Sequence, residues 1–123
     1  MLFLYKTEVI DIHERLIEEF GGINGLRDEG ALESALSSVE NRAYYENADI
    51  LICAATYAYH LTQAHAFIDG NKRIAAAISE IFLDINSIRL NATNDQIVDL
   101  FLSIASGEKS RNDVEQIFLQ WVS

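Results

Sequence analysis

The sequence predicts an all-α protein with a single domain over residues 1–123, a compact bundle of about six helices. Three observations predict this fold. Apolar residues recur at helical spacing along most of the chain, helix-capping residues precede the apolar segments, and the sequence contains no proline. A chain of 123 residues is long enough for one hydrophobic core and too short for two.

The first two helices and their connections occupy the N-terminal part of the chain. We expect Thr7 to cap the first helix, which ends at the glycine pair 21–22. After a structured turn, Asp28 caps a short helix that ends near Val39. Residues 40–48 are predicted to form a polar loop that carries tyrosines.

Two apolar helices follow and should form the core. Asp49 caps a helix that runs to about Ala64 and is apolar on nearly every face, as expected of a central, buried helix. A second helix, from near Asn71 to about Ile85, is also rich in Ala, Ile and Leu. We therefore expect these two helices to pack against each other.

The last part of the chain predicts an extended link over residues 86–92 and two further helices. Capping patterns at residues 93–96 and 110–113 begin these helices, which end at Gly107 and Trp121.

Composition excludes several classes of protein. There are 19 acidic and 9 basic residues and no basic cluster of about four or more residues, which disfavours nucleic-acid binding. No segment approaches the ~20 apolar residues of a membrane helix. Cys53 is the only cysteine and lies in an apolar run, so we expect a buried packing residue and a reducing compartment. The predicted location is the cytoplasm, with neither nucleic acid nor membrane as a partner.

Chemical groups concentrate between the two core helices. Their positions place residues 70–73 in the first turn of a helix, where free N–H groups and the helix dipole attract phosphates. Lys72 and Arg73 add full positive charges. The predicted phosphate-binding residues are Gly70, Asn71, Lys72 and Arg73.

Two further groups suggest catalysis at the same turn. Asp69 would repel an anion unless a divalent cation such as Mg²⁺ bridged them. Imidazole side chains commonly act as general bases, which makes His65 the candidate base. Phe67 is expected to anchor the turn in the core. Each residue alone has an ordinary explanation as a cap, a turn or a solvated face. Their occurrence together within nine residues favours a catalytic site. His13 and His60 are expected to be packed or hydrogen-bonded instead.

The run His-Ala-Phe-Ile-Asp-Gly-Asn-Lys-Arg at 65–73 resembles the signature of the Fic/Doc superfamily. The lysine at position 72 makes the run similar to the motif of the death-on-curing (Doc) branch. The similarity extends over nearly the whole chain. It implies the compact helical Fic core, with His65 deprotonating a hydroxyl of a protein target. It also implies that Asp69 orients that hydroxyl or holds Mg²⁺, and that residues 70–73 clamp the phosphates of ATP.

The same resemblance assigns further roles. The loop at residues 40–47 matches the region that docks the target, which makes Arg42 and Tyr45 secondary candidates. In the Fic branch a glycine stands at the position of Lys72 and an arginine at that of Ala76. By this resemblance, the two departures imply transfer of the γ-phosphate of ATP. The catalytic candidates are then His65, Asp69 and Lys72.

The resemblance therefore implies the toxin of a type II toxin–antitoxin system. Such a toxin is a kinase that phosphorylates a Ser or Thr of a translation factor similar to elongation factor Tu and arrests translation. No self-inhibitory Ser/Thr-x-x-x-Glu-Gly/Asn pattern is present, so we expect a separate antitoxin as partner. Gly70 is the residue of the Fic branch, where the best-known Doc motif has Ala.

Three alternatives stay open. The first is an adenylyltransferase of the Fic type that transfers AMP to a protein hydroxyl. The second is a non-catalytic module that binds nucleotide or antitoxin, against which the presence of His65 argues. A helical DNA-binding domain is the third, and the net charge of -10 disfavours it.

Overall fold

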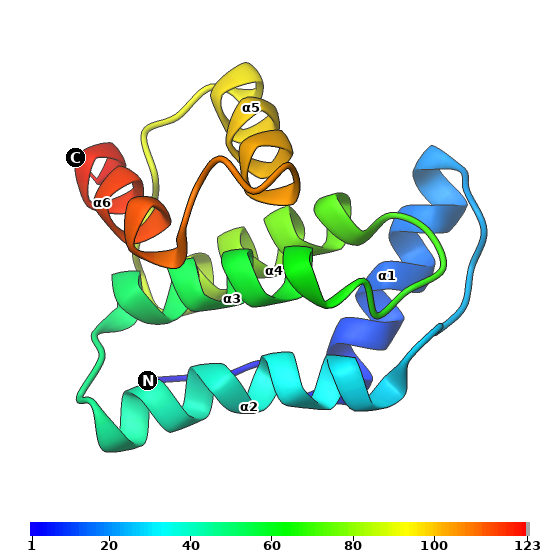
Figure 1. Cartoon of the computed structure of the whole chain (residues 1–123), viewed down its shortest axis with the longest axis horizontal. Coiled ribbons are helices and arrows are strands. Elements are labelled where there is room, and N and C mark those ends of the chain that lie inside the picture. Colours follow the sequence, from blue (N-terminus) through cyan, green and yellow to red (C-terminus); the bar gives the residue numbers. More distant parts are fainter. Residues whose placement is uncertain (123) are drawn as a thin grey trace.

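A computed structural model describes residues 1–122 and confirms the all-α prediction (Figure 1). Over these residues the only extended pairings are two isolated bridges. The six helices are α1 (Lys6–Phe20), α2 (Glu29–Tyr45), α3 (Ile50–Ala64), α4 (Asn71–Ile85), α5 (Asn94–Ala105) and α6 (Arg111–Trp121).

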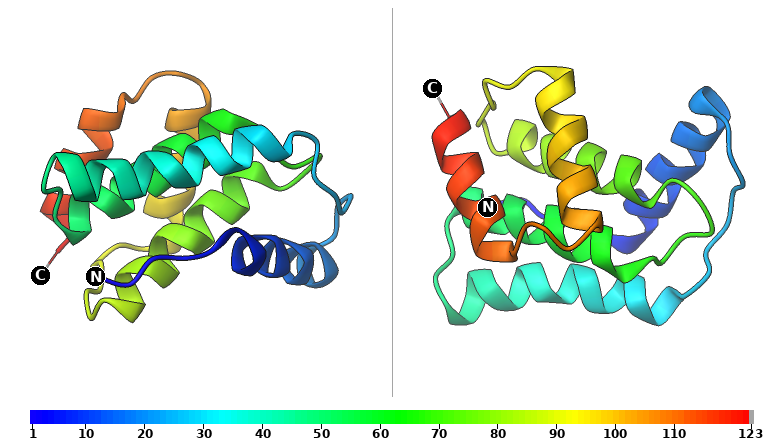
Figure 2. Two further views of the ribbon diagram at one scale, coloured as in Figure 1. Left: turned by 90° about the horizontal axis from the view of Figure 1, so that it is seen from below. Right: turned by 45° about the horizontal axis from the view of Figure 1, so that its top comes forward.

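Helix α3 is the centre of the bundle and packs against α2, α4, α5 and α6. It lies beside α4, with α2 on one side of this pair and α5 and α6 on the other, while α1 packs against α4 and α2 (Figures 1 and 2). Cys53 is fully buried within α3, as the sequence predicts. None of the helices in the described part of the chain is long and apolar enough to cross a membrane.

Local capping explains where four of the helices begin. The predicted caps Asp28, Asp49, Thr93 and Ser110 each accept a hydrogen bond from the backbone N–H three residues further on. The link at 86–92 runs beside the end of α6, where the N–H of Asn91 donates to the Trp121 carbonyl at 2.7 Å. The starts of these four helices follow from the sequence, because each capping hydrogen bond spans only three residues.

The prediction that Thr7 caps α1 is wrong. Helix α1 begins at Lys6, and Tyr5 is the residue at its N-cap. The Glu8 carboxylate accepts a hydrogen bond from the Tyr5 backbone N–H at 2.9 Å and so closes the first turn from inside the helix.

The predicted loop at residues 40–48 is also corrected, because α2 continues to Tyr45 and Glu46 is its C-cap. Arg42 explains the extension. Its side chain is 13% exposed and forms an ion pair with Glu115 of α6, so the last turns of α2 pack on the bundle. Only residues 46–49 then connect α2 to α3.

Candidate active site

The candidate site is built on the motif turn, residues 65–70, which joins the two central helices. His65 caps the C-terminal end of α3 in the left-handed conformation, with φ 47° and ψ 42°. Gly70 precedes α4 in the same region, with φ 76°. A left-handed non-glycine residue costs on the order of 1 kcal/mol, so the fold holds His65 in a strained position, as is frequent at functional sites.

The motif turn is anchored from within by Phe67, as predicted. Phe67 is 2% exposed, and its ring stacks on that of His13 with 3.8 Å between centroids. The Asn71 side chain holds the same residue, since its Oδ1 accepts from the Phe67 N–H and its Nδ2 donates to the Phe67 carbonyl, both at 3.0 Å. The amide side chain of Asn71 is therefore committed to the turn, and its backbone N–H is the group left for a ligand.

A loop that is distant in sequence covers the motif turn. The N–H of Arg27 donates to the Ala66 carbonyl at 2.7 Å, and the N–H of Ile68 donates to the Gly25 carbonyl at 3.0 Å. The sequence predicts a structured turn at residues 23–28. It carries no local signal that this turn lies against the motif, because the pairing joins segments about 40 residues apart.

The Asp69 carboxylate is held next to the N-terminus of α4 by two backbone donors. Its Oδ1 accepts from the Gly70 N–H at 2.8 Å, and its Oδ2 accepts from the Ile23 N–H at 3.2 Å. A Cβ atom at Gly22 would lie 2.7 Å from this Oδ2, so a glycine is required there. The carboxylate is therefore fixed in place before any ligand binds.

Asp69 is a suitable single protein ligand for a phosphate-bound cation. Among residues 1–122 no group of three or more His, Cys, Asp or Glu side chains could hold a metal by itself. Mg²⁺ is commonly held by one or two carboxylates, with phosphate oxygens and water completing its octahedron. The residues present fit a metal that arrives with a nucleotide and do not form a closed metal cage.

The first turn of α4 presents an anion-binding surface. No side chain caps this helix terminus, which leaves its backbone N–H groups available to an anion. Lys72 and Arg73 are exposed beside it. The Arg73 guanidinium lies over the ring of Phe20, 4.8 Å from its centroid, so α1 supports the arginine from below.

A cavity of about 390 Å³ opens at this turn. Its polar end consists of residues 69–73, and Ala76 of the next helical turn also lines it. Its apolar wall comes from α5, with side chains Ile97, Val98, Phe101 and Leu102. A cationic end joined to an apolar wall is an arrangement that suits an anionic ligand with an organic part. His65 is exposed at the other end of the motif turn.

The structure does not bring Arg42 and Tyr45 to the motif turn. Arg42 donates to Thr56 Oγ1 at 3.0 Å, and Thr56 precedes the end of α3 by two helical turns, roughly 12 Å. Tyr45 is exposed and its ring packs on Tyr44, with 4.9 Å between centroids. Both residues lie toward the opposite end of α3.

The two other histidines are packed and hydrogen-bonded, as predicted. His60 of α3 is half-buried, and its Nε2 lies 3.2 Å from an Arg111 nitrogen, so the ring nitrogen accepts. His13 of α1 is buried, and its Nε2 lies 2.7 Å from the Asp69 carbonyl oxygen. This contact with the motif turn could not be predicted from local sequence patterns, because it joins residues 56 positions apart.

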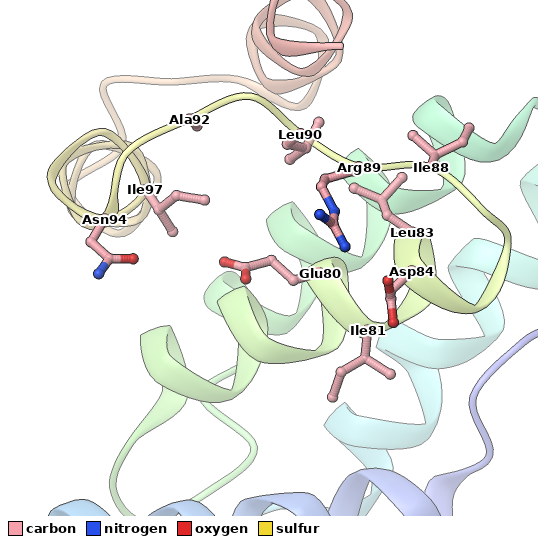
Figure 3. A pocket seen from close by; sticks show the side chains of 10 residues that line it. All are labelled: Glu80, Ile81, Leu83, Asp84, Ile88, Arg89, Leu90, Ala92, Asn94 and Ile97. Carbon is pink, nitrogen blue, oxygen red and sulfur yellow. The ribbon is translucent and has the colours of Figure 1, made fainter. Parts of the chain in front are cut away.

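A separate cavity of about 330 Å³ lies between the second half of α4, the link at 86–92 and the start of α5. The side chains of Glu80 and Asp84 from α4 and of Arg89 from the link line it (Figure 3). It contains none of the residues of the motif, so the cavity at α5 and the motif turn is the candidate site.

Comparisons with known proteins match most of the chain to one family. The sequence model of the Fic/DOC family matches residues 3–83, which include α1 to α3 and most of α4. The chain is 33% identical over 115 residues to the protein kinase Doc of Escherichia phage P1, covering 93% of this chain and 90% of that protein. It is 37% identical over 94 residues to the toxin Doc of Mycolicibacterium smegmatis, covering 72% of each.

Proposed function

Because the chain belongs to the Fic/DOC family, we propose that it is a Doc-type toxin that transfers the γ-phosphate of ATP to a protein hydroxyl. The hydroxyl is that of a Ser or Thr in a translation factor similar to elongation factor Tu, and its phosphorylation arrests translation. The relatives named as a protein kinase and as a toxin support this proposal.

The observation that carries the proposal is that Lys72 and Ala76 line the same cavity at the N-terminus of α4. An ammonium stands where the Fic pattern has glycine, and a methyl group where it has arginine. A bulky cation and a missing second arginine change where the phosphates of a nucleotide are held. This difference favours presentation of the γ-phosphate over that of the α-phosphate.

In this proposal each residue of the motif has its own role in the transfer of the γ-phosphate, which is a single substitution at phosphorus. The His65 imidazole takes the proton of the attacking hydroxyl, whose oxygen bonds to the γ-phosphorus while ADP leaves. The backbone N–H groups of Asn71, Lys72 and Arg73 in the first turn of α4 bind the phosphate oxygens, and the two cationic side chains neutralise their charge. Gly70 lets the phosphate approach the backbone because it has no Cβ atom. Asp69 orients the hydroxyl or holds Mg²⁺, which supplies further neutralisation of the phosphates.

Isotope labelling tests the proposal. The purified protein is added to a cell lysate with ATP labelled at either the γ- or the α-position, and the labelled protein is identified by mass spectrometry. Label from the γ-position alone is expected, and loss of a general base in His65→Ala should slow its transfer by roughly 10²- to 10⁴-fold. His60→Ala is the matched control, because it removes the imidazole of a nearby histidine that contacts Arg111 and lies outside the motif turn.

Two results would replace the proposal by another. Label that transfers only from the α-position makes the protein an adenylyltransferase. Growth arrest that survives His65→Ala, without label from either position, indicates a non-catalytic module.

The proposal includes a separate antitoxin and a cytoplasmic location, where translation takes place. Expression of the toxin alone should arrest growth, and coexpression of the antitoxin should restore it. The two proteins should copurify, and an arrest that no coexpressed partner relieves would contradict this part of the proposal.

A further inference from the structure

We infer that His13 of α1 is a positioning residue for the phosphate site. Its ring fixes the peptide between Asp69 and Gly70, so that the Asp69 carboxylate and the first amides of α4 face the cavity. This inference rests on the proposed function, because it assigns to His13 a role in positioning the groups of the same phosphate site. It concerns a residue that lies outside the nine-residue motif and outside the cavity lining.

The geometry of His13 leaves its ring one orientation. The residue is 1% exposed, and its ring lies 3.8 Å from that of Phe67 at an interplanar angle of 14°. Its Nε2 lies 2.7 Å from the Asp69 carbonyl oxygen. A carbonyl oxygen only accepts hydrogen bonds, so Nε2 carries the hydrogen and donates it. Stacking sets the plane of the ring, and the hydrogen bond sets its rotation.

This bond determines which way the next amide points. In a trans peptide the carbonyl and the following N–H point in opposite directions. With the Asp69 carbonyl directed toward α1, the Gly70 N–H points away from α1, where the Asp69 Oδ1 accepts it at 2.8 Å. The Gly70 carbonyl in turn accepts from the Ile74 N–H at 2.9 Å, which starts the first turn of α4. The contact therefore sets the entry direction of the anion-binding helix.

Two neighbours on α1 complete the support. Ile17 and Phe20 follow His13 by four and seven residues and share one helical face with it. The Ile17 Cδ1 would lie 3.4 Å from a Cβ built at Gly70, and the Phe20 ring lies under the guanidinium of Arg73. An apolar residue in place of His13 would pack equally well but would leave the Asp69 carbonyl without its donor.

Paired substitutions separate positioning from packing. His13→Phe keeps the aromatic stack on Phe67 and removes the donor, whereas His13→Gln restores an N–H donor without the ring. His60→Phe makes the same chemical change at a half-buried histidine that is bonded to Arg111. For each variant we would measure urea unfolding, binding of ATP and of inorganic triphosphate by calorimetry, and kcat and KM of γ-phosphate transfer.

We expect His13→Phe to lower kcat/KM by roughly 10- to 100-fold, because a small displacement of phosphate-binding groups is costly. Its affinity for inorganic triphosphate should fall in parallel. His60→Phe should lose comparable stability without this effect, and His13→Gln should recover most of the transfer. Wild-type transfer and affinity in a folded His13→Phe variant would overturn the inference.

A measurement on the nucleotide-free protein distinguishes this inference from the proposed function. The ¹⁵N spectrum should show His13 with its hydrogen on Nε2, and the Gly70 and Asn71 amide signals should shift in His13→Phe. If wild type neither binds ATP nor transfers label, the proposed function fails. These signals alone then test whether His13 orients the peptide between Asp69 and Gly70. A His13 ring without a hydrogen on Nε2 in wild type overturns the inference, and that result does not depend on whether any variant folds.

Discussion

Arg42 of α2 contacts two carboxylates that differ in burial, and removing them one at a time should separate their contributions to stability. Glu115 of α6 has a side chain that is 14% exposed and pairs with the Arg42 guanidinium, itself 13% exposed. Glu46 is 57% exposed and lies 3.5 Å from the Arg42 Nε. We expect Glu115→Gln to destabilise the fold strongly and Glu46→Gln to change it little.

The magnitudes follow from what each substitution leaves behind. Removing one partner of a fully buried ion pair costs about 3–5 kcal/mol. Thr56 Oγ1 still accepts from Arg42 at 3.0 Å, and both partners keep some contact with water, so about 2–3 kcal/mol is expected for Glu115→Gln. An exposed pair contributes about 0.2–1 kcal/mol, which is the expected loss for Glu46→Gln. For a chain of this length, 1 kcal/mol corresponds to about 4 °C in Tm.

Urea unfolding and calorimetry of both variants provide the test. The midpoint Tm should fall by about 8–12 °C for Glu115→Gln and by at most about 4 °C for Glu46→Gln. A double-mutant cycle with Arg42→Met isolates the coupling between Arg42 and Glu115. Equal, small losses for the two glutamates would refute the reasoning. Folded Glu115→Gln should keep its transfer rate, whereas lost transfer at full stability would favour the docking role predicted for Arg42.

Three further predictions concern Gly22, His60 and Cys53. Gly22→Ala should displace the Asp69 carboxylate and lower γ-phosphate transfer by more than tenfold, roughly the effect of misplaced reacting groups. Gly21→Ala, which also has a positive φ but nothing within 4 Å of its Cβ, should keep near-native transfer; equal losses in both would contradict the close approach to Asp69. Burial, with nearby guanidinium groups, lowers the pKa of His60 below 6.5, so the unfolded chain binds more protons between the two pKa values. Stability should therefore fall as pH drops through 6.5 and level off below the pKa of His60 in the folded protein. The test is the difference in urea midpoint between wild type and His60→Gln, measured against pH. A difference that does not change with pH would refute this prediction. Burial raises the pKa of the Cys53 thiol to about 11, so iodoacetamide at pH 8 should label it only at the rate of unfolding, and rapid labelling of the native protein would count against its burial.

Much of the fold could be predicted because its signals are local. The caps Asp28, Asp49, Thr93 and Ser110 bond to amides three residues away, and these short-range bonds mark the starts of four helices. The C-terminal end of α2 could not be predicted this way. Its last turns are polar in sequence, and the partner that keeps Arg42 helical lies 73 residues away in α6.

The candidate site also combines features that local sequence patterns predict with contacts that they do not. The motif at 65–73 predicted a phosphate-binding turn, because a glycine before a helix and two adjacent cations form one local pattern. The motif did not reveal that the loop at 21–28 pairs with it, or that His13 holds the Asp69 carbonyl. On the side of the motif both contacts use backbone groups, which every residue has, so the residue types within the motif carry no sign of the pairing.

The sequence by itself therefore determined the helices, apart from the start of α1 and the end of α2, and the buried pair at the centre. It also determined which chemical groups occur together at residues 65–73. Only the tertiary structure decided which distant groups hold that chemistry in place. It placed Arg42 in an ion pair with Glu115 and directed one face of α1 at the motif turn. The physical reason is that caps and helical periodicity act within a few residues, whereas buried polar groups take whichever partner the assembled core brings within hydrogen-bonding distance.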